Sequence, residues 1–168
     1  MTCFTVTSDG RLTAKQGAWR AALGKGGLTG AMLKRECDGG SPLGDWPMRR
    51  VFYRPDRLSP PRTALPLVPL QPWDGWCDAP DDPLYNRPVT RPYPASHEAL
   101  WRDDGRYDVI VELGYNDDPP VPGRGSAIFL HVAAPDYGPT EGCVALALPD
   151  LLEVLRDAGP GSILRITV

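Results

Sequence analysis

The sequence has few of the residues on which metal sites and nucleic-acid binding depend. It contains two histidines and four cysteines among 168 residues, and its 18 Lys and Arg are scattered among 21 Asp and Glu, for a net charge of −3. The absence of a basic patch excludes the electrostatic footprint of a nucleic-acid-binding protein. No segment approaches the roughly 20 apolar residues of a transmembrane helix. We therefore expect neither a nucleic-acid partner nor a membrane span.

A recognisable export signal is also missing. The first ten residues, MTCFTVTSDG, contain no basic stretch followed by an apolar one, whereas a secretory signal peptide has both. These residues alone therefore leave two alternatives: the protein stays in the cytoplasm, or it is exported by a route that this segment does not encode.

Proline, by contrast, is abundant, with 20 prolines beside 18 glycines. Each internal proline removes a helix hydrogen bond and clashes with the preceding turn, so long helices are excluded. The length predicts one domain over residues 1–168. We expect a mainly β fold, with mixed sheets or a sandwich, one or two helices and long proline-rich loops.

Alternating apolar residues and turn signals place the expected elements along the chain. Strands are expected at residues 3–7, 11–13, 18–23, 48–53, 107–113, 127–131, 143–148 and 162–168. Residues 149–158 are predicted to form a helix that Gly159 and Pro160 end. Residues 95–101 are a candidate second helix, with Ser96 as its N-cap.

Three segments are expected to be loops, at residues 24–30, 59–94 and 116–125. The second could be a disordered linker, but it contains Trp73, Trp76, Tyr85 and Tyr93. Disordered linkers are poor in aromatic residues, so we expect a packed segment, with little regular structure, that covers one face of the domain.

His131 and Cys143 form the strongest candidate for chemistry. His131 ends an apolar strand, and Cys143 begins the next one after an eleven-residue loop. Adjacent strands joined in this way would bring both side chains to one end of the sheet, where the imidazole can take the thiol proton. Backbone amides around Gly142 could then form an oxyanion hole. The alternative is a buried core cysteine, because free cysteine is among the most buried residue types.

Two segments resemble the L,D-transpeptidase catalytic domain, also called the YkuD domain. Residues 128–131 (IFLH) and 140–144 (TEGCV) match its histidine after an apolar strand and its later Ser/Thr, any residue or His, Gly, Cys and aliphatic residue. Residues 34–44 (KRECDGGSPLG) resemble its Gly-Asp-Gly-x-Thr-Pro-x-Gly segment, with Cys37 for glycine and Ser41 for threonine. The resemblance extends from about Lys34 to the C-terminus, and the matched motif residues beside Cys143 are Thr140, Glu141 and Gly142.

The resemblance implies an acyl transfer on peptidoglycan stem peptides, the donor and acceptor partners, in a single YkuD-like catalytic domain. His131 would deprotonate Cys143, whose thiolate attacks a carbonyl of the donor to give a thioester. An amine of a second stem, typically the side chain of meso-diaminopimelate, would resolve it into a cross-link. Water in place of that amine would make the protein an L,D-carboxypeptidase or endopeptidase. No metal or organic cofactor is implied, and a periplasmic location is expected from the function.

The chain also departs from the family pattern. Ala145 stands where the family usually has an arginine that can meet a substrate carboxylate, and Glu141 replaces the histidine of the tighter Ser-His-Gly-Cys variant. A short, proline-rich branch from Alpha- and Betaproteobacteria makes 1,3-type links with L-alanine as donor, and this chain resembles that branch. The missing arginine gives slight support to a further alternative, a non-catalytic peptidoglycan-binding module.

Further substrate-binding candidates are less specific. Solvated charge is the default interpretation of the arginines and a surface or packing role that of His97, while loop packing explains Tyr137 as well as pocket lining does; the candidates are His97, Arg102, Arg106, Arg124 and Tyr137. In an oxidising compartment, Cys3, Cys37 and Cys77 allow at most one disulfide beside a free Cys143. By residue type, zinc could be bound by Cys77, His97, His131 and Cys143. Their spacing lacks the close Cys-x-x-Cys pair of common structural zinc sites, so no metal site is predicted.

Overall fold

Strands dominate the computed structural model, which describes residues 1–168, and the mainly β prediction is confirmed. The elements are β1 (Cys3–Thr7), β2 (Arg11–Ala14), β3 (Gly17–Ala22), β4 (Leu28–Gly30), β5 (Ser41–Tyr53), β6 (Leu67–Pro69), β7 (Asp74–Cys77), β8 (Pro88–Thr90), β9 (His97–Ala99), β10 (Val109–Leu113), β11 (Phe129–Val132), β12 (Val144–Leu146), α1 (Leu148–Arg156) and β13 (Ile163–Ile166). No helix has the length and apolar character that crossing a membrane requires.

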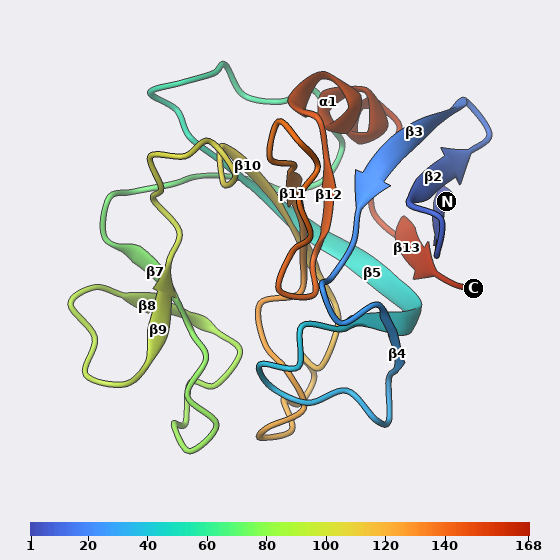
Figure 1. Cartoon of the computed structure of the whole chain (residues 1–168). Coiled ribbons are helices and arrows are strands. Elements are labelled where there is room, and N and C mark those ends of the chain that lie inside the picture. The colour runs from blue at the N-terminus through green and yellow to red at the C-terminus, as the bar shows by residue number, and fades with distance from the viewer.

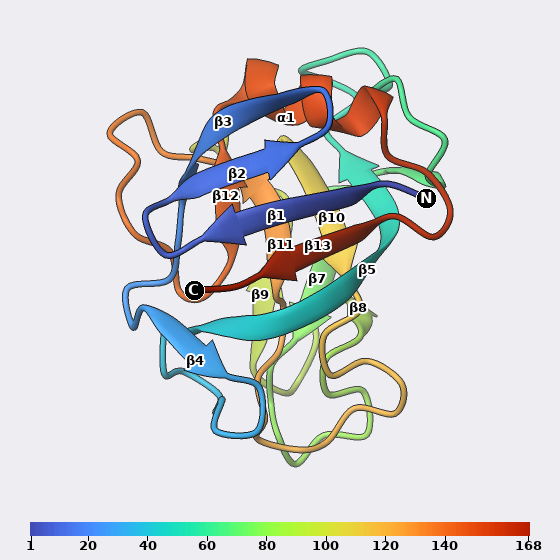
Figure 2. The ribbon, with the colours of Figure 1, turned by 90° about the vertical axis from the view of Figure 1, so that its right-hand side faces the viewer.

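The large sheet closes on itself into two layers. Its order is β10-β11-β12-β3-β2-β1-β13-β5-β4, and β10 also pairs with β5. The long strand β5 turns the corner, since residues 44–47 pair with β13 and residues 48–53 pair with β10. Strand β3 does the same between β2 and β12. Figure 2 shows β1, β2 and β13 in front of β10 and β11, as expected for a sandwich whose corner strands switch layers.

The main core lies between these layers. It is built from side chains that alternate along the strands, because successive residues of a strand point to opposite faces. Helix α1 covers one end of the core with Leu151, Val154 and Leu155, all fully buried. Each such aliphatic side chain contributes roughly 1.5–3 kcal/mol when it is removed from water. The apolar stripe predicted for this helix is therefore the face that the helix buries against the core.

A second, smaller core lies on the outer face of β10, β11 and β12. Val109 and Val111 point into the main core, while Ile110 and Phe129 point into this one together with Trp76. The Trp76 and Phe129 rings meet edge to face with their centroids 5.1 Å apart. Strands β10 and β11 are thus buried on both faces, which accounts for their nearly continuous apolar sequences.

The proline-rich segment supplies the cover over this second core. Its strands β7 and β8 form an antiparallel sheet with β9, in the order β8-β7-β9, which lies beside β10 in Figure 1. The prediction that residues 59–94 pack against the domain is confirmed by the burial of Leu70, Trp76 and Tyr85. Regular structure in this segment is limited, as predicted, to the three short strands β6, β7 and β8.

Residues 95–101 do not form the predicted helix. They contain β9, which runs antiparallel to β7 and pairs Glu98 with Trp76 and His97 with Cys77. A helix this short is marginal in water without tertiary support, whereas the neighbouring strand β7 offers unpaired backbone groups. Because alternate strand residues point to opposite faces, Glu98 and His97 leave the backbone in opposite directions.

Two further boundaries differ from the sequence prediction. The glycine-rich segment ends in β4, which pairs in parallel with β5, and β5 begins at Ser41 instead of residue 48. The first half of β5 contains Pro42, Gly44 and Pro47, residues that usually argue against a strand. Here they are accommodated because this half pairs with the short strands β4 and β13 beside the corner.

Candidate active site

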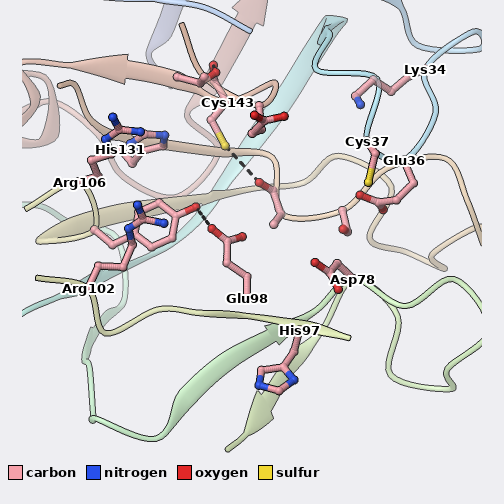
Figure 3. A pocket seen from close by; sticks show the side chains of 15 residues that line it. Lys34, Glu36, Cys37, Asp78, His97, Glu98, Arg102, Arg106, His131 and Cys143 are labelled. Atoms are coloured by element: carbon pink, nitrogen blue, oxygen red, sulfur yellow. Dashed lines mark hydrogen bonds between the residues drawn. The ribbon is translucent and has the colours of Figure 1, made fainter. Parts of the chain in front are cut away.

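A cavity of about 390 Å³ opens between the outer face of β11 and β12 and the small β7–β9 sheet. Both predicted catalytic residues, Cys143 and His131, line it, as do Thr140 and Glu141 of the predicted motif. Figure 3 shows Cys143 and His131 with labelled charged residues such as Glu98 and Arg106 around the same space. The fold therefore gathers residues from distant parts of the chain around the thiol of Cys143.

His131 and Cys143 reach the cavity from neighbouring parallel strands. The register pairs Leu130 with Val144 and His131 with Ala145. Cys143, directly before β12, therefore lies two positions earlier than the partner of His131, on the same face of the sheet. Its Sγ donates to the carbonyl oxygen of Ala127 at 3.2 Å and accepts from the amide of Phe129 at 3.3 Å. It makes no hydrogen bond to His131 in this resting arrangement.

The imidazole of His131 is held by the backbone. Its Nδ1 lies 2.9 Å from the carbonyl oxygen of Val132, so the tautomer with hydrogen on Nδ1 makes this bond and leaves Nε2 as the acceptor. The ring of Tyr107 meets the imidazole edge to face, with centroids 5.2 Å apart. A backbone carbonyl thus holds this imidazole at Nδ1, the atom that the aspartate of a Ser-His-Asp triad contacts.

Burial keeps both groups neutral at rest. It lowers the pKa of His131 to about 4, helped by the positive charges of Arg102 and Arg106. Burial raises the pKa of Cys143 to about 12, and the negative charge of Glu98 raises it further. A resting thiolate–imidazolium pair is therefore disfavoured at neutral pH.

The turn before Cys143 explains two motif residues. The Thr140 hydroxyl donates to the carbonyl oxygen of Cys143 at 2.6 Å and accepts from the amide of Gly142 at 3.1 Å. Gly142 has φ +127°, and a Cβ there would lie 2.7 Å from the carbonyl oxygen of Gly40. Only glycine fits this backbone position without strain, so the turn presents Cys143 in one orientation.

The upstream motif packs directly against this turn. The buried Ser41 hydroxyl accepts a hydrogen bond from the amide of Gly24 at 2.9 Å, and Gly24 forms an isolated bridge with Thr140. A Cβ on Gly24 would lie 2.2 Å from the carbonyl oxygen of Gly39 and 2.8 Å from the Cα of Gly142. Three backbone segments thus touch, which accounts for the glycines at this junction.

Cys37 replaces a glycine of the family motif, and its backbone has a conformation that favours glycine. Cys37 has φ +62°, a left-handed conformation that glycine adopts freely and other residues rarely. The neighbouring Asp38 carboxylate holds the loop, accepting from the amide of Gly40 at 2.8 Å and from Nζ of the buried Lys34 at 2.5 Å. Cys37 and Lys34 both line the cavity.

The structure brings some of the other predicted residues to the cavity and leaves two outside. Arg102 and Arg106 line it, and so does His97, although the His97 ring lies on the opposite face of β9 from Glu98 and contacts Arg91 and Tyr93. Tyr137 instead packs beneath Arg20, whose guanidinium carbon lies 4.1 Å from the ring centroid. Arg124 lies outside too, with Nη1 3.5 Å from the sulfur of Met32. Tyr137 and Arg124 therefore do not line the cavity, because contacts with Arg20 of β3 and with Met32 hold the two side chains elsewhere.

The two arginines of the cavity are held differently. Arg102 forms a two-point ion pair with Asp104 and lies 5.1 Å from the ring centroid of Tyr107. Arg106 has only a 3.8 Å contact with the same carboxylate, so its guanidinium is the freer of the two. Ala145, where the family usually has arginine, is fully buried.

Sequence reasoning missed Glu98. Its side chain lines the cavity and accepts a hydrogen bond from the Tyr107 hydroxyl. The sequence pattern predicts a helix over residues 95–101, whereas these residues contain the strand β9, and the strand geometry turns Glu98 toward the thiol (Figure 3). No local pattern in the sequence marks this residue.

The structure gathers no three His, Cys, Asp or Glu side chains into a group that could hold a metal ion. Cys77 pairs with His97 across β7 and β9, but it lies outside the cavity that contains Cys143. All four cysteines are free thiols, with Cys3 and Cys37 exposed.

The sequence matches one protein-family model, that of YkuD, the L,D-transpeptidase catalytic domain, over residues 2–166. Comparison with curated proteins and with solved structures gave no match.

Proposed function

The chain belongs to the family of the L,D-transpeptidase catalytic domain, and from this premise we propose that it cross-links peptidoglycan stem peptides through a thioester on Cys143. The observation that carries the proposal is the convergence of Cys143, His131 and the Thr140 turn on one cavity. The periplasm is the compartment we propose, because peptidoglycan is the substrate.

The acylation step uses the neutral thiol and imidazole that burial favours. As Sγ of Cys143 attacks the donor carbonyl, its proton moves to Nε2 of His131, while the Nδ1 contact with Val132 stabilises the imidazolium. The C–S bond forms, the scissile C–N bond breaks, and the proton leaves with the departing amine. Donor binding must displace Sγ from the carbonyl of Ala127, its present partner.

Two amides of the turn are suited to the developing oxyanion. The amide of Gly142 is already engaged by the Thr140 hydroxyl. The amides of Glu141 and Cys143 donate to no group of the protein, which leaves both for a substrate oxygen. Removal of one such donor typically costs about 10²–10³ in kcat.

Donor recognition in this proposal falls to Arg106 and Arg102 in place of the family's usual arginine. Both line the cavity on the side of His131, and a guanidinium pairs with a carboxylate through two parallel hydrogen bonds. With Ala145 buried beside β11, a carboxylate must bind elsewhere than in the usual family arrangement. This difference supports a donor other than diaminopimelate, such as the L-alanine of 1,3-type links.

The thioester can react with two kinds of acceptor, and the acceptor determines whether the protein is a transpeptidase or a hydrolase. Attack by an amine gives a cross-link, whereas attack by water gives a shortened stem and makes the protein an L,D-carboxypeptidase or endopeptidase. The walls of the cavity include four carboxyl-bearing residues, which favour a cationic amine over water as the acceptor; they are Glu36, Asp78, Glu98 and Glu141.

Mass spectrometry of purified muropeptides incubated with the chain tests the proposal. We expect new dimers from the wild type and none from Cys143→Ala, with fragmentation identifying the donor as L-alanine or diaminopimelate. Shortened monomers alone would establish the hydrolase. Cross-linking that persists in Cys143→Ala would refute the thioester mechanism, and binding without any product would point to a non-catalytic peptidoglycan-binding module.

A further inference from the structure

The acceptor amine poses a proton problem that His131 alone does not solve. A side-chain amine has a pKa near 10.4, so it enters the cavity at neutral pH as an ammonium with no lone pair to attack the thioester. It must lose one proton before the attack and a second one as the C–N bond forms. His131 can take the second proton, but a different base is needed for the first.

We infer that Glu98 is that base: it binds the acceptor ammonium opposite Cys143 and takes its first proton. This inference rests on the proposed transpeptidase function. Glu98 comes from β9, on the wall that faces β11 and β12, and its carboxyl group points into the cavity toward Cys143 (Figure 3). Thioester and carboxylate thus face each other across the space that an acceptor must enter.

The contacts of Glu98 fit a base rather than a structural carboxylate. It takes part in none of the protein's ion pairs, and its side chain has a single hydrogen bond, from the Tyr107 hydroxyl. Tyr107 also packs edge-on against His131. One tyrosine therefore positions both proton acceptors, through its hydroxyl and through its ring.

The charges around Glu98 set its basicity. Burial raises its pKa, and the negative charges of Asp78 and Glu36 on the other walls raise it further. The hydrogen bond from Tyr107 and the positive charge of Arg102 oppose this effect. An incoming ammonium favours the ionised carboxylate as well, so Glu98 is charged when the acceptor binds and more basic than an exposed carboxylate when it accepts the proton.

The step then balances. The ammonium gives one proton to the Glu98 carboxylate, and the neutral amine attacks the thioester carbon. As the C–N bond forms and the C–S bond breaks, the second proton passes through His131 to Sγ of Cys143. Glu98 later releases its proton to water, so the products are the cross-link, the free thiol and one proton.

The test separates acylation from transfer in Glu98→Gln, whose amide can still accept from Tyr107. We expect Cys143 thioester formation at the wild-type rate, measured by intact mass with donor alone. Cross-linking near neutral pH should fall about 10²-fold, within the usual range for loss of a general base. The deficit should shrink about tenfold for each unit of rising pH, as the free amine becomes available.

The chain offers a matched control. Glu153 accepts from the indole N–H of Trp19 at 3.0 Å and lies outside the cavity, so Glu153→Gln makes the same chemical change away from the thiol and should keep the wild-type pH profile. An acceptor with an α-amino group, whose pKa is near 8, should lose much less activity with Glu98→Gln than a side-chain amine does.

Three outcomes would overturn the inference. An unchanged cross-linking rate and pH profile in Glu98→Gln would show that Glu98 takes no proton. Acylation and transfer that fall together would show a structural role. A wild type that forms no thioester would refute the proposed function, and the inference with it.

Discussion

Cys143 and His131 lie on adjacent parallel strands and line one cavity, yet the thiol hydrogen-bonds to Ala127 and not to the imidazole. With burial holding the pKa of the thiol near 12 and that of the imidazole near 4, both groups are neutral at rest. In the proposed mechanism, a substrate must displace the thiol from Ala127 before Sγ can attack.

Thiol labelling should discriminate among the cysteines. At neutral pH iodoacetamide should modify Cys3 and Cys37, which are exposed, well before Cys143, which is buried and protonated. Peptide mass spectrometry after timed quenching gives the order, and labelling in denaturant shows that the Cys143 peptide is detectable. If Cys143 reacted before Cys37, a preformed thiolate would replace the neutral pair described here.

Folding stability should fall in mild acid because of His131. Its pKa is about 4 in the native state and near 6.5 in the unfolded chain. Between these values the unfolded chain binds a proton that the native histidine does not, so stability is lost as the pH falls from about 6.5 to about 4, by on the order of 3 kcal/mol. Urea denaturation across this range measures the loss, and His131→Gln should remove that part of the pH dependence. An identical slope in the variant would contradict the assignment.

Gly142→Ala should destabilise the protein by roughly 1–3 kcal/mol, the cost of a strained left-handed residue, because its Cβ would lie 2.7 Å from the carbonyl oxygen of Gly40. Acylation should fall as well, since Cys143 follows directly. The control is Gly30→Ala, whose Cβ meets only the Leu33 side chain, at 3.9 Å. Thermal melts compare the two variants, and equal melting temperatures would show that the turn relaxes without cost.

Arg106→Ala should raise the KM for the donor stem about tenfold or more, because a charge-assisted hydrogen bond contributes roughly 1.5–3 kcal/mol. Arg106 is the better choice than Arg102, whose removal would also disturb Asp104 and Tyr107. Arg124→Ala, which changes an arginine outside the cavity, serves as the control. Steady-state kinetics with a purified donor decides, and an unchanged KM in Arg106→Ala would exclude this arginine from donor binding.

The sequence alone determined the elements whose pattern is local. The hairpin at residues 3–13, strands β10 and β11 and helix α1 follow from alternation, apolar runs and helix-ending residues within a few positions of each other. The local pattern also identified His131 and Cys143 as candidates for chemistry. His131 lies near the end of a strand that the apolar pattern marks, and Cys143 directly precedes another. The motif residues beside Cys143 form a turn that closes within four residues.

Tertiary structure decided what depends on distant partners. Residues 97–99 form a strand because β7 offers its backbone to pair with, and only that strand turns Glu98 into the cavity. Likewise β5 extends to Ser41 despite its prolines because β4 and β13 flank it. Tyr137 and Arg124 miss the cavity because Arg20 and Met32 hold them elsewhere. Local sequence encodes backbone preference, whereas the direction in which a side chain points across a cavity is set by packing between segments that the sequence keeps far apart.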